Sequence, residues 1–447
     1  MFDKLLVANR GEIAVRIIRT AKELGLRTVA VFSEADRDSL AVRFADEAVC
    51  IGPPAAAKSY LNGDAIIAAA RETGAGAIHP GYGFLAENAS FAEAVNAAGL
   101  VFVGPEAQTI RTMGDKAAAR AAARAAGVPI VPGSDGEVVD LAHAVAVARH
   151  IRYPVMLKAS AGGGGRGIRV AVDEIDLAHH FHTAQAEAKA AFGHGAVYLE
   201  RFLSRARHLE VQVLGDGERI VHCFERECSL QRRRQKVWEE APSPALDAAT
   251  REKLCTSAVR LAGGARYRGA GTLEYLYDEE TGDFFFIEMN TRIQVEHPVT
   301  EMLSGIDLVR EMILVAQGKR LPLTQPDVTM RGAAIEVRIN AENAEQNFRP
   351  SPGRVTALAL PGGPGVRVDT MLYPGCVVPP YYDSLLAKII VHAETRDLAL
   401  ARLRRALDEF EVDGIVTTAS LHKRLVRLPD VQAARYHTGF LEQLLKA

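Results

Sequence analysis

Five polar side chains recur at every second position of one segment, namely Glu288, Asn290, Arg292, Gln294 and Glu296. In an extended strand this spacing places all five on one face, because successive side chains point to opposite sides. Carboxylate and amide oxygens are ligands that magnesium and manganese prefer. The row therefore predicts a site for a divalent cation.

The segment before this row supplies another acid. Gly271–Tyr277 has a strand pattern, and residues 278–283 (Asp-Glu-Glu-Thr-Gly-Asp) are typical of a turn. In the resulting hairpin Glu274 would lie opposite Glu288, and directly opposed like charges destabilise a strand pair. A shared cation removes this conflict, with Asn290 as a further oxygen ligand. The alternative is a charged hairpin exposed to solvent.

The length of the row predicts a bend. Eight residues of straight strand span about 26 Å, which is too far for Glu288 and Glu296 to serve one small reaction centre. We therefore expect the chain to turn after Asn290.

A glycine-rich loop follows Lys158, which ends the apolar strand Met156–Lys158. Residues 162–167 (Gly-Gly-Gly-Gly-Arg-Gly) fit G-x-G-x-x-G, but a strand follows them where a dinucleotide site has a helix. Glycines in such a hairpin can offer backbone N–H groups to phosphates. The loop is interpreted as a mobile flap over phosphates, and the alternative is a flexible surface hairpin.

Three other segments carry charges on or beside strand patterns. His208, Glu210 and Gln212 alternate along one strand, and the alternative to a site is an exposed strand face. The charged run 225–236 is typical of solvated surface, although it could supply Lys236 and arginines to an anion. Arg338 interrupts the apolar strand 335–339.

Composition limits the class of protein. The 447 residues suggest about three domains, and 48% apolar with 24% charged residues is ordinary for a globular protein. A net charge of −2 gives no reason to expect nucleic acid or an acidic membrane as partner. Five cysteines without a C-x-x-C pair predict free thiols in a reducing compartment. Charged residues throughout positions 1–20 argue against a signal peptide, so we expect the cytoplasm.

The elements that must position these residues begin with a βαβ pattern. A strand over 4–9, a helix over 12–24 and a strand over 27–32 predict a parallel sheet, which later strands near 75–80 and 100–103 extend. A helix from 116 ends at Gly127, and the pattern breaks near 130. A β-rich segment follows 345, and an amphipathic helix covers 399–410.

These residues together resemble the biotin carboxylase component of biotin-dependent carboxylases, in the ATP-grasp superfamily. The resemblance runs almost from end to end. It rests on seven segments: 8–14, 79–84, the Lys158 glycine loop, 231–242, 288–298, 338–342 and 379–384.

The resemblance implies an α/β (in part α+β) ATP-grasp fold. Residues 1–113 would form a Rossmann-like domain, 114–334 the ATP-grasp domain with a mobile lid at about 131–203, and 335–447 a β-rich C-terminal domain. It also implies a ligase that uses ATP, two Mg²⁺ or Mn²⁺ ions and bicarbonate to carboxylate biotin through carboxyphosphate.

The resemblance further implies a role for each matching residue. Lys116 and Lys158 would hold the ATP phosphates under the flap. The flap residues expected to bind ATP are Gly163, Gly164, Gly165 and Gly167. Those expected beside the adenine and ribose are Glu200, Leu203, His208 and Gln231. The metal ligands would be Glu274, Glu288 and Asn290, and the bicarbonate pocket Lys236, Arg292, Gln294 and Val295. Glu296 would be the base and Arg338 would stabilise the biotin enolate. Arg16 and Asp383 would lie toward the biotin site and the dimer contact.

Two features separate this chain from the general pattern. Arg234 stands where the family usually has histidine, and arginine cannot deprotonate. No Met-Lys pair occurs, whereas a biotinylated lysine in this family normally sits in a Met-Lys-Met setting. We therefore expect the biotin carrier and the carboxyltransferase on separate chains, and a homodimer of this chain.

The expected reaction is the first half-reaction of an acyl-CoA carboxylase, with acetyl-CoA carboxylase of fatty acid synthesis as the expected type. Propionyl-CoA, other acyl-CoA thioesters, pyruvate and urea stay open as final acceptors. Two alternatives have different readouts. Another ATP-grasp ligase would cleave ATP without bicarbonate, and a nucleotide-binding protein would bind ATP without turnover. At Glu296, the alternative to a base is a carboxylate that pairs with Arg292 only to hold the bend.

Overall fold

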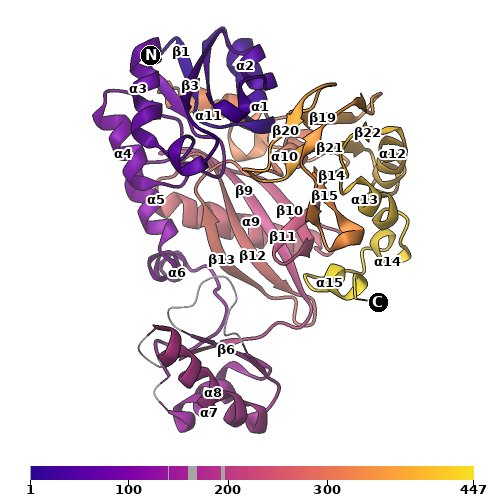
Figure 1. The fold of residues 1–447 in the computed structure, drawn as a ribbon. Coiled ribbons are helices and arrows are strands. Elements are labelled where there is room, and N and C mark those ends of the chain that lie inside the picture. Colours follow the sequence, from indigo (N-terminus) through magenta and orange to yellow (C-terminus); the bar gives the residue numbers. More distant parts are fainter. Residues whose placement is uncertain (1, 139, 160–168, 193–196, 447) are drawn as a thin grey trace. The chain divides into compact units, whose positions relative to one another are not determined.

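The structure is a computed structural model that describes residues 2–138, 140–159, 169–192 and 197–446 (Figure 1). The chain divides into two compact units. The larger unit contains residues 1–128, 207–276 and 288–447, and the smaller one contains 129–206 and 277–287. Among the described helices, none combines the length and the apolar character needed to cross a membrane.

The N-terminal part of the larger unit is built on a parallel five-stranded sheet in the order β3-β2-β1-β4-β5. The strands are β1 (Lys4–Val7), β2 (Arg27–Ser33), β3 (Glu47–Gly52), β4 (Ala77–His79) and β5 (Val101–Phe102). The helices of this part are α1 (Gly11–Glu23), α2 (Leu40–Phe44), α3 (Gly63–Thr73), α4 (Ala89–Ala97), α5 (Ala107–Gly114) and α6 (Lys116–Ala125). The predicted βαβ opening and parallel sheet are confirmed.

Apolar residues on both faces of this sheet explain its helical covering, because a parallel sheet must be buried on both sides. One face packs with α1 and α11 (Leu308–Ala316), through residues such as Leu5, Ile17 and Ile313. The other face packs with α3 and α4, through residues such as Leu6 and Phe91.

An eight-stranded sheet in the order β13-β12-β9-β10-β11-β14-β21-β19 carries the polar residues of interest. Its strands are β9 (Ala206–Asp216), β10 (Ile220–Arg232), β11 (Gln235–Ala241), β12 (Arg268–Asp278), β13 (Phe284–Asn290), β14 (Ala333–Asn340), β19 (Val366–Thr370) and β21 (Leu385–Ala393). The predicted turn between the two strands of the metal hairpin lies between Asp278 and Phe284. Strand β13 ends at Asn290, so the predicted departure from a straight strand is also confirmed.

Helices of the larger unit flank this sheet. They are α9 (Ala248–Gly264), α10 (His297–Ser304), α12 (Arg396–Glu409), α13 (Ala419–Leu425), α14 (Pro429–Gln432) and α15 (Phe440–Leu444). Helix α12 packs its apolar side against β14 and β21 through Leu403 and Leu407. The expected β-rich tail contains three two-stranded sheets, formed by β15 (Glu342–Asn343) with β16 (Arg349–Pro350), β17 (Gly353–Arg354) with β20 (Val377–Val378), and β18 (Ala357–Ala359) with β22 (Glu411–Asp413).

The smaller unit has its own sheet and core. Strands β7 (Arg169–Ala171), β6 (Val155–Ala159) and β8 (Val197–Arg201) form an antiparallel sheet. Helices α7 (Leu141–Ile151) and α8 (Glu174–Phe192) contribute apolar side chains to its core, including Phe181. Strands β6 and β7 flank the glycine-rich segment, which confirms the two predicted strands, whereas the segment itself lies outside the described residues. The three-domain division and the mobility of the lid stay predictions.

Candidate active site

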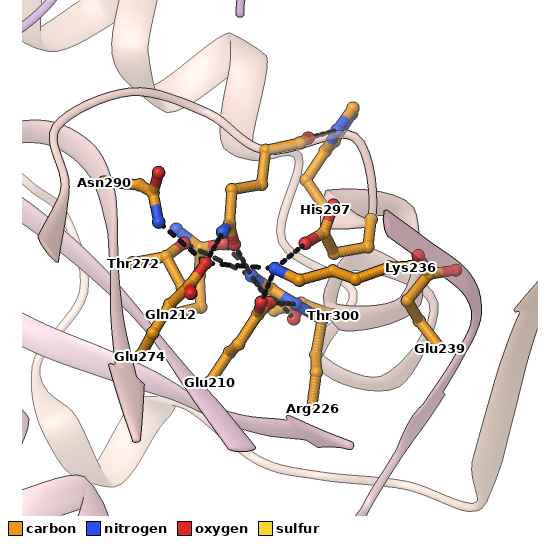
Figure 2. A network of polar contacts seen from close by, with 12 residues as sticks. Glu210, Gln212, Arg226, Lys236, Glu239, Thr272, Glu274, Asn290, His297 and Thr300 are labelled. Carbon is orange, nitrogen blue, oxygen red and sulfur yellow. Dashed lines mark hydrogen bonds and ion pairs between the residues drawn. The ribbon is translucent and has the colours of Figure 1, made fainter. Parts of the chain in front are cut away.

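The candidate active site is gathered around the ammonium group of Lys236 on β11 (Figure 2). Its Nζ atom lies 3.0 Å from Glu274 Oε1 and 3.0 Å from Glu296 Oε1. Glu210 Oε1 on β9 accepts a further hydrogen bond from the same nitrogen. Three strands and the segment that follows β13 therefore bring three carboxylates to one cation, whose side chain is 12% exposed.

The charges of this cluster stabilise one another. Burial favours the neutral form of a carboxyl group and raises its pKa. Burial is the largest single influence on Glu210, Glu274 and Glu296, but Lys236 together with the other nearby cations outweighs it, and each pKa lies below its usual value. Burial acts against the charge of Lys236 as well, but Glu210 and Glu296 outweigh it and raise the lysine pKa well above normal. All four groups are therefore charged at neutral pH.

The other two predicted metal ligands, Asn290 and Glu288, interact with Glu274. Asn290 Nδ2 donates to Glu274 Oε1 at 2.8 Å. Burial and then the charge of Glu274 raise the pKa of Glu288, which shows that the two acids repel each other. Two mutually repelling carboxylates beside a buried amide fit a divalent cation, because a cation removes the repulsion and uses the oxygen ligands.

Arg338 on β14 links Glu296 to a second acid, Glu239 on β11. Its Nη2 lies 2.9 Å from Glu296 Oε2 and 2.6 Å from Glu239 Oε1. Burial raises the pKa of Glu239 to about 7 even though Arg338 acts in the opposite direction. Glu296 thus lies between two cations, Lys236 and Arg338.

Arg226 on β10 belongs to the same cluster and is fully buried. It donates to Gln294 Oε1 at 2.6 Å, to Gln212 Oε1 at 2.8 Å and to Thr300 Oγ1 at 2.8 Å. It also lies 3.3 Å from Glu210. Because Gln294 Nε2 donates to Glu274 at 2.9 Å, the orientation of this amide is set at both ends.

His208 on β9 contacts the same acids. Its Nε2 lies 3.1 Å from Glu274 Oε2 and 3.4 Å from Glu210 Oε1. Burial lowers the pKa of His208, but Glu274 and Glu210 outweigh burial and raise it to about 9. These three side chains are also close enough together to hold a metal ion.

Arg292 is held away from Glu296 by another acid. Its Nε donates to Glu87 Oε2 at 2.9 Å and its Nη2 donates to Asn290 Oδ1 at 2.9 Å. Within the described residues Glu296 pairs with Lys236 and Arg338 instead. The alternative in which Glu296 pairs with Arg292 only to hold the bend is therefore wrong.

The residues predicted to bind ATP are described to different extents. Lys116 begins α6, and its charge acts on Glu288. Lys158, Glu200 and Leu203 belong to the smaller unit, and Gly163, Gly164, Gly165 and Gly167 lie outside the described residues. Gln231 is buried and pairs with Lys236 in the β10–β11 register. Their roles toward ATP stay predictions.

Arg16 and Asp383 do not contact each other. Arg16 Nη2 lies 3.0 Å from Glu301 and 2.8 Å from Asp307. Asp383 is exposed and accepts a hydrogen bond from the backbone N–H of Leu385. Their predicted place near biotin and a dimer contact is not tested by these contacts.

Arg234 occupies the tip of the β10–β11 hairpin. Arg233 and Arg234 both have positive φ angles, 48° and 68°, and Arg232 pairs with Gln235 across the turn. This is the geometry of a two-residue type I′ turn. The Arg234 side chain is exposed and makes no ion pair or hydrogen bond with the described residues.

The charged run 225–236 differs from its sequence-based interpretation. The pattern is typical of solvated surface, yet Glu225, Arg226 and Glu227 are buried. Partners such as Arg251 on α9 for Glu225 and Thr300 on α10 for Arg226 come from other elements, which no local pattern reveals. Glu239 has no role in the predicted site, and the sequence singles out Glu210 only because it shares its strand face with His208 and Gln212.

Three family models match the chain. The N-terminal domain of biotin carboxylase covers residues 1–110, and the biotin carboxylase C-terminal domain covers 336–443. The ATP-binding domain of the carbamoyl-phosphate synthase L chain covers 115–324. The chain belongs to the biotin carboxylase family. It is therefore an ATP-dependent ligase.

Similar proteins match the sequence of this chain over nearly its whole length. Biotin carboxylase 1 of Bacillus subtilis (strain 168) is 54% identical over 99% of this chain and 98% of its own length. Biotin carboxylase of Pseudomonas aeruginosa is 56% identical over 96% of this chain and 95% of its own. A pyruvate carboxylase subunit from Methanothermobacter thermautotrophicus is 48% identical over 99% of this chain and 90% of its own.

Solved structures show the same fold. The biotin carboxylase domain of a thermophilic 2-oxoglutarate carboxylase, bound to bicarbonate, has a TM-score of 0.95 at 45% identity, covering 99% of this chain and 98% of its own. The corresponding domain dimer from Hydrogenobacter thermophilus, in complex with MgADP, ADP and bicarbonate, has a TM-score of 0.89 at 47% identity, covering 99% of this chain and 98% of its own. The expected ATP-grasp biotin carboxylase fold is thereby confirmed.

Proposed function

We propose that this biotin carboxylase uses ATP and bicarbonate to carboxylate biotin that is attached to a carrier on a separate chain. The observation that carries the proposal is the position of Glu296. This carboxylate lies between Lys236 and Arg338, and Lys236 also reaches the metal-ligand carboxylate Glu274. The reaction needs a base beside bicarbonate and a metal site beside the ATP phosphates, and this arrangement provides both.

The phosphate end of the site would use Glu274, Glu288 and Asn290 to hold Mg²⁺ or Mn²⁺. A bound divalent ion supplies charge neutralisation to the phosphoryl group in transfer. Lys116, together with Lys158 and the glycine-rich loop, would bind the ATP phosphates. A complex of a similar domain with MgADP supports this assignment.

Glu296 takes the first proton. The O–H bond of bicarbonate breaks, the proton moves to a Glu296 carboxylate oxygen, and the resulting oxyanion attacks the γ-phosphorus of ATP. The bond between that phosphorus and ADP breaks, which yields ADP and carboxyphosphate. Lys236 and Arg292 stabilise the dianion formed by deprotonation, because fixed cations in a buried site interact strongly with developing charge.

Anion binding itself would increase the basicity of Glu296. In the free protein, Lys236 and Arg338 hold the pKa of Glu296 below its usual value despite burial. An anion that binds Lys236 competes with Glu296 for the ammonium group. Glu296 is then held less strongly and its pKa rises, which favours proton transfer.

Arg338 acts in the second half of the reaction. Carboxyphosphate breaks down to carbon dioxide and phosphate. The released phosphate takes the proton of the biotin ureido N–H group, and the deprotonated nitrogen forms its new bond to the carbon dioxide. The enolate form of biotin carries a negative oxygen that Arg338 would stabilise. Once Glu296 has gained a proton it attracts Arg338 less, so the guanidinium group is freed for this role.

Acetyl-CoA is our proposed final acceptor, with the carboxyltransferase on another chain and a homodimer of this one. A dimer of a similar domain supports the homodimer. Other similar proteins belong to pyruvate and 2-oxoglutarate carboxylases, so these two acids are the competing acceptors. Five free cysteines support a cytoplasmic location. Co-purification of the native partner chains tests the acceptor: recovery of a pyruvate-specific carboxyltransferase would contradict acetyl-CoA.

Carboxylation of free biotin tests the reaction. Radiolabelled bicarbonate, ATP, Mg²⁺ and free biotin should yield acid-labile label on biotin, and ATP cleavage should require bicarbonate. Cleavage that is independent of bicarbonate would favour another ATP-grasp ligase. ATP binding without cleavage would favour a nucleotide-binding protein.

A further inference from the structure

The turn Gln294–His297 is held by two fully buried side chains that have no role in the predicted site, Lys388 on β21 and His297 at the start of α10. Lys388 Nζ donates to the backbone carbonyl of Val295 at 2.8 Å. His297 Nδ1 lies 2.8 Å from the backbone carbonyl of Gln294, and Figure 2 shows this contact of the His297 ring. Two successive carbonyl groups are therefore fixed just before the base, Glu296.

A fixed carbonyl group also fixes the N–H group of the same peptide. A trans peptide is planar, and its N–H points opposite to its C=O. The N–H of Val295 therefore points away from His297, and the N–H of Glu296 points away from Lys388. Neither N–H donates to an acceptor among the described residues. Successive unpaired N–H groups of this kind make an anion-binding concavity.

We propose that Lys388 and His297 are positioning residues, which fix the two carbonyls so that the N–H groups of Val295 and Glu296 face the substrate anion. The inference rests on the proposed function for the identity of that anion, bicarbonate. It gives a role to a lysine in an apolar strand and to a histidine that is not needed for proton transfer.

The surroundings of both side chains suit this task. Glu12 lies 3.0 Å from Lys388 Nζ and Asp369 lies 3.9 Å from it, so the ammonium group is paired in the core. Burial and then the charges of Lys388 and Arg16 hold the pKa of His297 well below its usual value. A neutral ring facing a carbonyl at 2.8 Å must carry its proton on Nδ1. The ring is then a donor to Gln294 at every working pH.

A pair of variants at His297 tests whether the Nδ1–H group matters as a hydrogen-bond donor or whether the ring only fills space. The Nδ2 atom of asparagine occupies the place of Nδ1, whereas the amide nitrogen of glutamine reaches the place of Nε2. We expect His297→Asn to keep the KM for bicarbonate within about threefold of wild type. We expect His297→Gln to raise it about tenfold or more, as for the loss of a buried hydrogen bond. The KM for ATP should stay unchanged in both variants.

Lys388 is tested with its counter-charge removed, because an unpaired buried carboxylate destabilises a fold strongly. The double variant Lys388→Met/Glu12→Gln should raise the KM for bicarbonate about tenfold or more while ATP binding is kept. Lys4 and Glu47 offer a matched control. Lys4 is buried, pairs with Glu47 at 2.6 Å and donates to the backbone carbonyl of Thr73. Lys4→Met/Glu47→Gln should leave the KM for bicarbonate unchanged.

The measurement is the bicarbonate dependence of ATP cleavage, with thermal unfolding as the check that each variant folds. Equal KM values for bicarbonate in His297→Asn and His297→Gln would overturn the role of the ring. An unchanged value in a folded Lys388→Met/Glu12→Gln protein would overturn the role of Lys388. If that double variant does not fold, the His297 pair still decides the inference. A wild-type enzyme without any response to bicarbonate would instead refute the proposed function, and the inference would fall with it.

Discussion

The Lys236 ammonium group lies 3.0 Å from Glu296 Oε1, so the proposed base is paired with the cation that its substrate needs. Substrate binding and activation of the base are then one event, since bicarbonate must share Lys236 with Glu296. The same lysine touches Glu274 at 3.0 Å, which connects the anion end of the site to the metal end.

Glu288→Gln should lower metal-dependent ATP cleavage strongly. Losing one charge from a metal clamp on a transferring phosphoryl group costs on the order of several kcal/mol in the transition state. The free protein should unfold at an equal or higher temperature, because the repulsion between Glu288 and Glu274 is removed. Rates measured across a Mg²⁺ or Mn²⁺ titration test this, and an ATP–metal structure with both carboxylates far from the ion would contradict it.

Arg234→His should keep or raise activity. Both residues of the β10–β11 turn have positive φ angles, a conformation in which histidine is more common than arginine. The side chain is exposed and makes no contact with the described residues that the substitution would break. A loss of activity of tenfold or more, equivalent to about 1.4 kcal/mol, would show that the pocket has adapted to arginine.

Glu336→Gln should make stability less dependent on pH. Glu336 on β14 lies opposite Glu239 on β11, is fully buried and makes no hydrogen bond through its carboxyl oxygens within the described residues. Burial, with Glu239 and Glu296 opposing Lys388 and Arg338, raises its pKa well above normal. The folded protein therefore keeps a proton that the unfolded chain releases near its ordinary pKa of about 4.3.

The sign of this effect follows from the raised pKa. The stability that protonated Glu336 contributes is complete below the unfolded pKa and is lost as pH rises toward the folded pKa, at about 1.4 kcal/mol per unit. Glutamine cannot ionise, so the variant should gain unfolding temperature relative to wild type between about pH 5 and 8. The exposed Glu345→Gln serves as control. A constant difference between variant and wild type across this range would contradict the prediction.

The sequence was informative where chemistry follows from neighbouring positions. Alternation and turn composition placed Glu274 near Glu288, and strand length predicted the departure of the chain after Asn290. Arg226 could not be placed in this way. Its partners Gln212, Thr300 and Gln294 come from other elements, and a charged run has the same local pattern in a core as at a surface.

The partners of Lys388 could not be predicted from the sequence either, although the lysine itself stands out in it. A lone lysine in the apolar strand Leu385–Ala393 was a usable signal, because burying an ammonium group requires a partner. The sequence does not show that the partner is Glu12, more than three hundred positions away, or that the carbonyl is that of Val295. Such pairings depend on how β21 packs beside α1 and the turn before α10.

The most direct test of the proposed mechanism is the bicarbonate-stimulated ATP cleavage of Glu296→Gln, measured beside calorimetric ATP binding. Glutamine keeps the shape of the side chain but cannot accept the proton, and loss of a general base typically costs about 10²–10⁴-fold in rate. We predict that most bicarbonate-dependent cleavage is lost while ATP affinity stays near wild type. A rate within a few-fold of wild type, or a parallel loss of ATP binding, would contradict the mechanism and would make Glu296 a structural residue.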